Sequence, residues 1–595
     1  MKMLIEPILI SGIAGLCILC MPKGFKRFIE VFALLVTCYL FIGSIRIFMN
    51  APVEGRLLYV DNLSRFIVPA IGFFGLVISL YSLRFMTTYE GLNIYYANII
   101  WTIGLSMLST ISNNMIILVM AWGGLGLTLY ILINIAGPDA AGISKKAFII
   151  VGGSDGLMIL GFCLVWLITG DLVLSKIRIA IDNPISFWAF ILILSSGLAK
   201  AGAMPFHTWI PDTAKEAPIP VTAILPASLD KLLGIYLIAR LVLGIFILDE
   251  FSYTILMVIG SLTIVGAVMM ALVQEDFKRL LGYHAVSQVG YMVLGIGTGN
   301  PVGIAGGLFH MLNHAIYKSC LFLAGGNVEY RTKTSELDSL GGLARFMPLT
   351  FFAMLISAFS ISGIPPFNGF FSKWMIYQGI VEKSKDGGVL WVFCLVSAMF
   401  GSALTLASFI KLIHAIFLGK PNESLKYPAS NLEVAWSMLV PVVCLAVLCM
   451  IFGVFAYLVP LRYIIPIVSD IKFIGTWQSI RSSMFLVMGL FAGFILYLMI
   501  STRSIRESHF YIGGEELEGD MKLSGTEFYN TVKEMDILKG IYKKSEEGLF
   551  DIYEQGKNVV FGIGRFFQYL HNGVLPTYMV WTLIGMIGLF LFLMR

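Results

Sequence analysis

The chain has 595 residues, of which 58% are apolar and only 13% are charged, and its mean hydropathy is +0.86. So apolar a composition excludes an ordinary soluble globular protein and predicts a membrane protein. The net charge of +5 is small and scattered along the chain, which excludes nucleic acid as a partner.

Apolar runs long enough to cross a bilayer recur from one end of the chain to the other. A run of about 18 or more apolar residues crosses the hydrocarbon layer as a helix, because lipid offers backbone N–H and C=O groups no other partner. The sequence therefore predicts an all-α polytopic membrane protein with roughly sixteen transmembrane helices. The predicted spans are 4–20, 28–49, 64–83, 93–110, 113–135, 147–169, 186–204, 219–246, 252–273, 280–298, 301–327, 348–380, 389–418, 434–459, 480–502 and 575–594. No small-residue cleavage site follows the first span, so we expect that no signal peptide is removed.

The basic residues of the loops predict the orientation, because short loops rich in Lys and Arg stay in the cytoplasm. With the N-terminus outside, one topology places nearly all of the basic loops inside, namely those with Lys23, Lys26, Arg27, Arg84, Lys145, Lys146, Lys278, Arg279, Arg331, Lys333, Arg345, Lys420, Lys426, Arg503 and Arg506. We therefore predict a multi-pass protein of the cell inner (cytoplasmic) membrane.

Two spans carry the same kind of break. The seventh runs into Met204-Pro205-Phe206, and the twelfth runs into Gly363-Ile364-Pro365-Pro366-Phe367. Proline breaks a helix, and in lipid such a break survives only where protein or water covers it. Corresponding breaks in two halves are typical of inverted-repeat transporters with an ion path near mid-membrane. The predicted division is 1–92 for the N-terminal helices, 93–246 and 252–418 for two antiporter-like inverted repeats, and 419–510 for additional transmembrane helices.

The C-terminal part differs in character. A polar stretch at 511–516 precedes a helical pattern from about 526 to 571, and an apolar span follows at 574–595. A helix of about 45 residues is about 68 Å long. Because this helix is amphipathic, we predict that 511–573 is a lateral helix on the cytoplasmic membrane surface, anchored by the last span. An ordinary helical linker is the alternative.

Ionisable side chains lie inside the apolar spans, where a charge is costly and usually faces a cavity or a partner. Lys200 comes just before the first break, and Lys373 follows the second. Burial disfavours the charged form, which lets a lysine exchange its proton. Lys231 begins the intact part of the eighth span, and Asp155 is the only carboxylate of the sixth, where it can pair with a lysine.

Three titratable residues, His310, His314 and Lys318, are spaced by four in one apolar span. This spacing stacks them on one helix face about 6 Å apart per step. Histidine titrates near neutral pH and passes protons between its two nitrogens, so the pattern predicts a proton relay that ends at a lysine.

Other polar residues are candidates for the places where a proton enters or leaves. His207, Asp212 and Glu216 lie in the segment after the first break, and His284 and Lys411 lie within later spans. Solvated loop charges are the alternative for the first three. We find no metal site, nucleotide motif or haem motif, and expect neither a cofactor in this chain nor bond chemistry by it. The Cys17-x-x-Cys20 pair is interpreted as packing.

Four segments resemble the antiporter-like subunits shared by respiratory complex I, Mrp cation antiporters and membrane-bound hydrogenases, and the resemblance covers about residues 60–420. They are LAKAGAMPFHTWIPDTAKEAPIPVTA, ALVQEDFKRLLGYHAVSQVGYM, HMLNHAIYKSCLFLAGG and LGGLARFMPLTFFAMLISAFSISGIPPFNGFFSKW. The long surface helix with a closing span looks like the lateral arm of the largest such subunit of complex I. LPASLDKLLGIYL, GYHAVSQVGYM, PPFNGFFSKWMIYQ and YIGGE look most similar to the large membrane subunit of Ech-type and formate hydrogenlyase-type [NiFe] hydrogenases.

The resemblance implies a subunit that translocates H⁺ or Na⁺ within an energy-converting hydrogenase complex. It implies a [NiFe] centre and iron–sulfur clusters on peripheral hydrogenase and iron–sulfur subunits, and it implies as partner a second antiporter-like or quinone-channel-like membrane subunit. The ion path it implies runs through Lys200, Lys231, Lys318 and Lys373, with His310 and His314 bridging the halves. Alternatives are a subunit of complex I or of a ferredoxin-linked relative, an Mrp-like cation/proton antiporter, and a structural scaffold.

The chain departs from this family at two positions. Many relatives carry a Trp-Glu pair in the fifth span, but this chain has Trp122-Gly123, so the carboxylate that pairs with the lysine of the seventh span is missing. Either Asp155 takes over that role, or this subunit pumps differently or not at all. Pro226 stands where complex I relatives often have a histidine.

Overall fold

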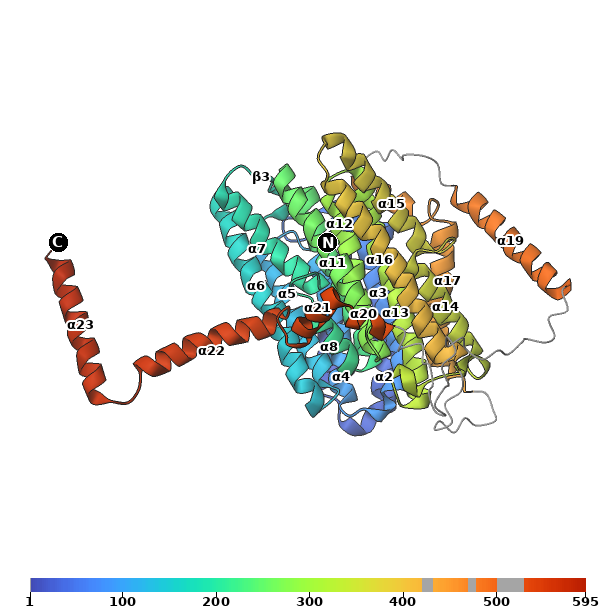
Figure 1. Ribbon diagram of the computed structural model, residues 1–595, viewed down its shortest axis with the longest axis horizontal. Coiled ribbons are helices and arrows are strands. Elements are labelled where there is room, and N and C mark those ends of the chain that lie inside the picture. The colour runs from blue at the N-terminus through green and yellow to red at the C-terminus, as the bar shows by residue number, and fades with distance from the viewer. Residues whose placement is uncertain (1, 420–431, 469–477, 500–528, 595) are drawn as a thin grey trace. The chain divides into compact units, whose positions relative to one another are not determined.

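The computed structural model describes residues 2–419, 432–468, 478–499 and 529–594 (Figure 1). The chain forms two compact units, Met1–Glu534 and Met535–Arg595. The predicted polar stretch 511–516 lies outside the described residues, as do 526–528 and the basic residues Lys420, Lys426, Arg503 and Arg506.

The first unit is built from packed helices. Its N-terminal part comprises α1 (Lys2–Leu19), α2 (Lys26–Met49), α3 (Asn62–Phe85), α4 (Leu92–Ile111), α5 (Met115–Asn134), α6 (Ala141–Thr169), α7 (Pro184–Ala201), α8 (Trp209–Glu216), α9 (Ile219–Ile224) and α10 (Asp230–Arg240). Its second part comprises α11 (Glu250–Leu272), α12 (Phe277–Gly297), α13 (Pro301–Thr332), α14 (Pro348–Ser362), α15 (Asn368–Glu382), α16 (Leu390–Ile413), α17 (Trp436–Val454), α18 (Pro460–Val468), α19 (Ser479–Met499) and α20 (Asn530–Glu534).

Strand structure in the described residues is confined to two small pairs. The strands β1 (Val53–Glu54) and β2 (Tyr59–Val60) pair antiparallel, and β3 (Ile179–Ala180) and β4 (Phe246–Ile247) pair parallel. They join loops at helix ends, so the fold is carried by the helices.

The helices confirm a multi-pass membrane protein of the all-α class. Within the described ranges, twelve helices are long and apolar enough to cross a membrane, and Met3–Leu19 and Pro348–Ser362 are shorter apolar helices. The predicted total number of spans and the assignment of two inverted repeats stay predictions. In Figure 1, α5–α7 lie on one flank of the first unit, α14 and α17 lie on the other, and α11–α13 lie between them.

The most buried part of the first unit is its centre. Every residue from Ile219 to Ala239 is buried, and α12 and α13 are buried over most of their length. Small residues let these helices approach closely, which is the usual way in which membrane helices pack. A Cβ atom on Gly290 of α12, for example, would lie 2.6 Å from the carbonyl oxygen of Gly260 on α11.

Both predicted helix breaks are present. The helix α7 ends at Gly202 (φ +78°), and α14 ends at Gly363 (φ +83°), so that the predicted single span 348–380 consists of α14 and α15. Each glycine adopts a left-handed conformation that other residues rarely tolerate, and it closes its helix by donating its N–H to carbonyls of the last turn. The two halves thus end a helix by the same device.

The predicted continuous helix from 526 to 571 is wrong. The chain instead forms α20, then α21 (Asp536–Glu546), α22 (Ile552–Leu570) and α23 (Leu575–Leu593). Gly548 (φ +78°) interrupts the helical pattern, and the Asp551 side chain caps the new start by accepting from the backbone N–H of Tyr553. The helix α22 has 19 residues and a length of about 28 Å. The lateral position of this segment on the membrane stays a prediction.

Candidate ion-translocation site

The predicted basic residues are buried in the first unit. The exposed fractions of their side chains are at most 2%, for Lys200 on α7, Lys231 on α10, Lys373 on α15, and His310, His314 and Lys318 on α13. A membrane protein tolerates so many buried basic groups only where partners or water stabilise the charge. The contacts of each group therefore indicate what it can do.

Two lysines bind the carbonyl groups at the two helix breaks. The Lys231 Nζ donates a hydrogen bond to the carbonyl of Ala201, the last residue of α7. The Lys373 Nζ donates to the carbonyl of Ile361, next to the last residue of α14, at 2.8 Å. Carbonyls in the last turn of a helix lack partners within the helix, and they carry the negative end of the helix dipole. Each break thus supplies a site for a cation, and a lysine occupies it.

Lys200 lies in a different environment. Its Nζ has no hydrogen-bond partner among the described residues and lies 4.8 Å from the ring centre of Trp122. The Trp122 Nε1 donates to the Ser196 hydroxyl at 3.0 Å, and that hydroxyl donates to the Asp155 carboxylate at 3.1 Å. Lys200 is the strongest charge acting on Asp155. Asp155 therefore lies near Lys200, as we expected, and is held through Ser196 and Trp122.

Position 123 cannot supply a carboxylate. Gly123 is exposed, and a Cβ atom there would meet nothing within 4 Å. One turn further along α5, a Cβ atom on Gly126 would lie 3.5 Å from an Asp155 carboxylate oxygen. The carboxylate beside α5 thus comes from α6.

The two histidines of α13 differ in their contacts. The His310 Nε2 lies 3.1 Å from the Gln288 Oε1, and its Nδ1 lies 2.9 Å from the Ser372 hydroxyl. Because an amide oxygen only accepts, the contact with Gln288 requires a proton on Nε2, whereas the Ser372 hydroxyl can donate to Nδ1 or to the carbonyls of Asn368 and Gly369. In contrast, the His314 ring has no side-chain hydrogen-bond partner among the described residues, and its one polar contact is with the backbone of Ala227. Buried polar groups of this kind are usually satisfied by internal water.

Lys318 is the third of the spaced titratable residues on α13, after His310 and His314, and lies near Phe409 of α16. Its Nζ has no hydrogen-bond partner in the described part of the chain and lies 5.7 Å from the ring centres of Phe322 and Phe409. The other face of this region holds His284, whose Nε2 lies 2.8 Å from the Ser408 hydroxyl and whose ring centre lies 4.8 Å from that of Phe409. Phe409 thus lies close to two buried basic groups.

The remaining candidates lie toward the helix ends. Lys411 donates to the carbonyls of Leu272 at 2.6 Å and Gln274 at 2.8 Å. Asp212 of α8 binds Lys146 at 2.8 Å and Arg279 at 3.6 Å, so it ties α8 to α6 and α12. His207 is buried and Glu216, the last residue of α8, is half-buried.

The sequence analysis missed a carboxylate in the interior. Asp230, beside Lys231, is only 3% exposed. The signal was present, because Asp230 is an acidic residue inside the apolar 27-residue stretch Ile219–Ile245. Gln288 and Ser196, which hold His310 and Asp155, were also missed, and uncharged polar residues give no comparable signal in the sequence.

The far end of α10 carries an ion pair. Arg240 donates to both carboxylate oxygens of Asp61, at 2.5 and 3.0 Å. Burial alone would raise the pKa of the Asp61 carboxyl. The charge of Arg240, its hydrogen bonds and the hydrogen bonds from Ser64 outweigh burial and lower this pKa below its ordinary value. The pair lines a polar cavity of about 300 Å³ that Asn113 also lines.

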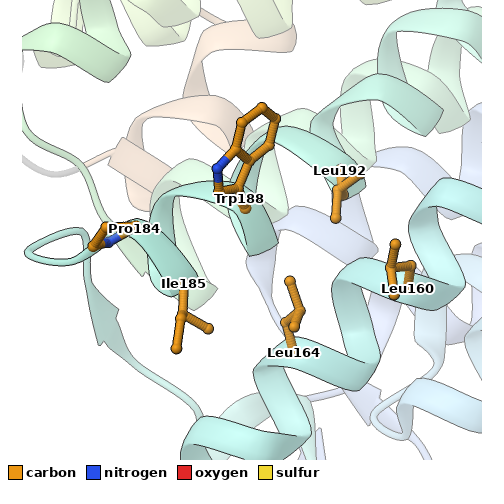
Figure 2. A pocket seen from close by; sticks show the side chains of 6 residues that line it. All are labelled: Leu160, Leu164, Pro184, Ile185, Trp188 and Leu192. Atoms are coloured by element: carbon orange, nitrogen blue, oxygen red, sulfur yellow. The ribbon is translucent and has the colours of Figure 1, made fainter. Parts of the chain in front are cut away.

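An apolar hollow lies between α6 and α7 (Figure 2). Side chains of both helices line it, namely Leu160, Leu164, Pro184, Ile185, Trp188 and Leu192. All of its lining side chains are apolar except for the indole N–H, and Trp188 is 55% exposed. Such a surface suits contact with lipid or another apolar chain, and it offers no path for an ion.

Broken helices and buried basic groups define a multi-pass membrane protein of the transporter-like class. Residues 112–401 match the family described as NADH:quinone oxidoreductase/Mrp antiporter, transmembrane. This match, with the relatives and structures below, supports an antiporter-like membrane subunit family for the chain.

Two curated relatives, both named as Na⁺/H⁺ antiporter subunits, show the extent of the similarity. The relative from Staphylococcus saprophyticus is 32% identical over 70% of this chain and 54% of its own length. The relative from Alkalihalophilus pseudofirmus is 29% identical over 74% of this chain and 59% of its own length. The chain thus spans just over half the length of these relatives.

Two solved structures share the fold. One is a chain of an archaeal respiratory membrane complex, the membrane-bound sulfane sulfur reductase, with a TM-score of 0.81 and 23% identity over 98% of this chain and 99% of that chain. The other is a chain of the Mrp complex from Dietzia sp., with a TM-score of 0.70 and 21% identity over 78% of this chain and 96% of that chain.

Proposed function

We propose that this chain is an ion-translocating subunit, for H⁺ or Na⁺, of a multi-subunit membrane complex of the Mrp type. The observation that carries the proposal is the pair of lysines that bind the carbonyls at two equivalent helix breaks, Lys231 at Ala201 and Lys373 at Ile361. Between them, α13 supplies further titratable groups in the buried interior. A row of groups that bind and release protons is what conduction through a bilayer requires.

The proposed relay joins the two halves through α13. His314 lies close enough to Lys231, Lys318 and His310 to interact with their charges. His310 in turn interacts with the charge of Lys373. In this proposal a proton passes between Lys231 and Lys373 through the histidines, in either direction. Imidazole suits this task because one nitrogen accepts a proton while the other releases one.

Lys200 and Asp155 form the other end of the relay in this proposal. Asp155 is linked through Ser196 to Trp122, whose ring lies beside the Lys200 ammonium, and so replaces the carboxylate that position 123 lacks. Lys318, His284 and Lys411 form a branch toward the end of α16. Separately, His207 and Glu216 of the α8 region are further candidates for proton uptake.

The relatives favour cation/proton antiport over the hydrogenase assignment. The curated relatives above are named as Na⁺/H⁺ antiporter subunits, and one solved relative belongs to an Mrp complex. None of these names supports a hydrogenase or a [NiFe] partner. We therefore propose other membrane subunits as partners and antiport as the leading activity.

A respiratory complex is the second candidate. The solved chain that matches nearly the whole length of this one belongs to a respiratory membrane complex. In that case peripheral partner subunits would hold the redox centres, and this chain would move ions in response. A hydrogenase with [NiFe] and iron–sulfur subunits is a narrower form of this candidate.

The test uses the complete complex, purified from native membranes through a tag on this chain. Its partners are identified by mass spectrometry, and it is reconstituted into liposomes that hold a pH-sensitive dye. Proton movement driven by a Na⁺ gradient without a redox substrate would support antiport. Proton movement that requires a redox substrate and redox partners would support the respiratory candidate. A complex that moves no ions under either condition would refute the proposed function.

A further inference from the structure

One buried carboxylate has no role in the relay described above. Asp230 is the first residue of α10 and is 3% exposed, inside a stretch that is buried on all sides. A carboxylate at this depth is costly unless opposite charges surround it. Its Oδ2 has no hydrogen-bond partner among the residues that the structure describes. Hydrogen bonding to Oδ2 therefore does not stabilise the charge of this carboxylate.

Asp230 lies where α7 and α10 cross. One turn further along α10, a Cβ atom on Gly234 would lie 2.5 Å from the backbone nitrogen of Ala201, so the two backbones are in contact. Lys231, the next residue, binds the Ala201 carbonyl, and Lys200 precedes Ala201 in the chain. The crossing thus brings one carboxylate to the two lysines of the first half.

The charges around Asp230 come from several helices. Lys200 of α7 and Lys231 of α10 act on Asp230, and Asp230 in turn acts on Asp155 of α6. On α13, His314 and Lys318 are the groups that Lys231 affects. One Asp155 oxygen accepts a hydrogen bond from Ser196, and one Asp230 oxygen has no hydrogen-bond partner among the described residues.

We propose that Asp230 is a further ion-translocation residue, the shared counter-charge of Lys200 and Lys231. It remains a carboxylate and stabilises whichever lysine holds the proton. In the step it assists, a proton leaves the Nζ of one lysine and binds the neutral Nζ of the other, directly or through water, and no electrons move. A carboxylate between two amines lowers the cost of both end states and of the charge in transit. This inference rests on the proposed function.

The test compares variants of the complete complex in the liposome assay, with transport expressed per assembled complex. Asp230→Asn keeps the shape and removes the charge, and Asp230→Glu restores the charge. The matched control is Asp249→Asn, because Asp249 only caps α11 by accepting from the Ser252 N–H and asparagine caps equally well. We expect transport by Asp230→Asn to fall about tenfold or more, while Asp230→Glu and Asp249→Asn retain most of it.

Wild-type transport separates the two proposals. If the wild-type complex moves no ions, the proposed function fails. If the wild type is active and Asp230→Asn transports at the wild-type rate per assembled complex, the role of Asp230 is refuted, whatever the yield of the variant. Equal loss in Asp230→Asn and Asp230→Glu would also refute it, because shape rather than charge would then matter.

Discussion

The substitution Gly234→Ala should separate α7 from α10 and impair transport. A Cβ atom at this position would lie 2.5 Å from the Ala201 nitrogen and 2.7 Å from the Gly197 carbonyl oxygen, both of them backbone atoms that cannot rotate away. Real Cβ contacts essentially never fall below 3.0 Å and ordinary contact begins at 3.4 Å, so a contact of 2.5 Å must lengthen by at least 0.5 Å and by 0.9 Å to become an ordinary one. Overpacking of this kind costs about 1–3 kcal/mol. The same movement stretches the hydrogen bond from Lys231 to the Ala201 carbonyl.

Thermal stability in detergent and transport per assembled complex measure the two effects. The matched control is Gly153→Ala on α6, where a Cβ atom meets nothing within 4 Å. Alanine stabilises a helix by about 0.5–1 kcal/mol relative to glycine, so the control should be as stable as the wild type or more so. If Gly234→Ala matched Gly153→Ala in stability and in transport, the close crossing of α7 and α10 would be refuted.

Three further predictions concern the buried charges. Lys200→Ala should reduce transport about a hundredfold or more without loss of assembly, and normal transport would remove this lysine from the relay. Lys373→Ala should behave in the same way in the same liposome assay, because the Ile361 carbonyl then binds no ammonium group. The ion pair with Arg240 lowers the pKa of Asp61 in the folded protein. The ion pair therefore stabilises the folded state fully above the unfolded pKa of about 3.9, and this stabilisation is lost as the pH falls through the lower folded pKa. Between about pH 5 and pH 3 the wild type should therefore lose more stability than Asp61→Asn, as measured by thermal unfolding at each pH. Parallel curves of stability against pH for the two proteins would contradict this reasoning.

Much of the fold could be predicted from the sequence, because lipid leaves few choices to an apolar chain. Long apolar runs mark the helices, and Pro205 and Pro366 mark the two breaks. The error at 526–571 has a local cause, since Gly548 ends a helix inside a pattern whose hydrophobic spacing continues. The spacing of hydrophobic residues gives no sign of a single residue in the left-handed conformation.

The burial of the candidate residues could be predicted from the sequence, and their contacts could not. A lysine inside an apolar span is conspicuous, and all four predicted lysines are buried. Lys231 binds the carbonyl of Ala201, 30 residues before it in the chain. This contact depends on how α7 and α10 cross, and no local sequence pattern specifies that crossing. Asp230 was missed although it lies in an apolar stretch, and which lysines it lies near depends on the same crossing of helices.

The carbonyl acceptors at the two breaks have a consequence for how fast and in which direction the relay can run. An ammonium group and a neutral amine both donate hydrogen bonds, so Lys231 and Lys373 can keep the same acceptor before and after a proton leaves. The side chain then needs little reorganisation, and the forward and backward steps meet the same geometry. A relay built in this way is reversible, and its direction is imposed by the ion gradients or by the partner subunits that drive it.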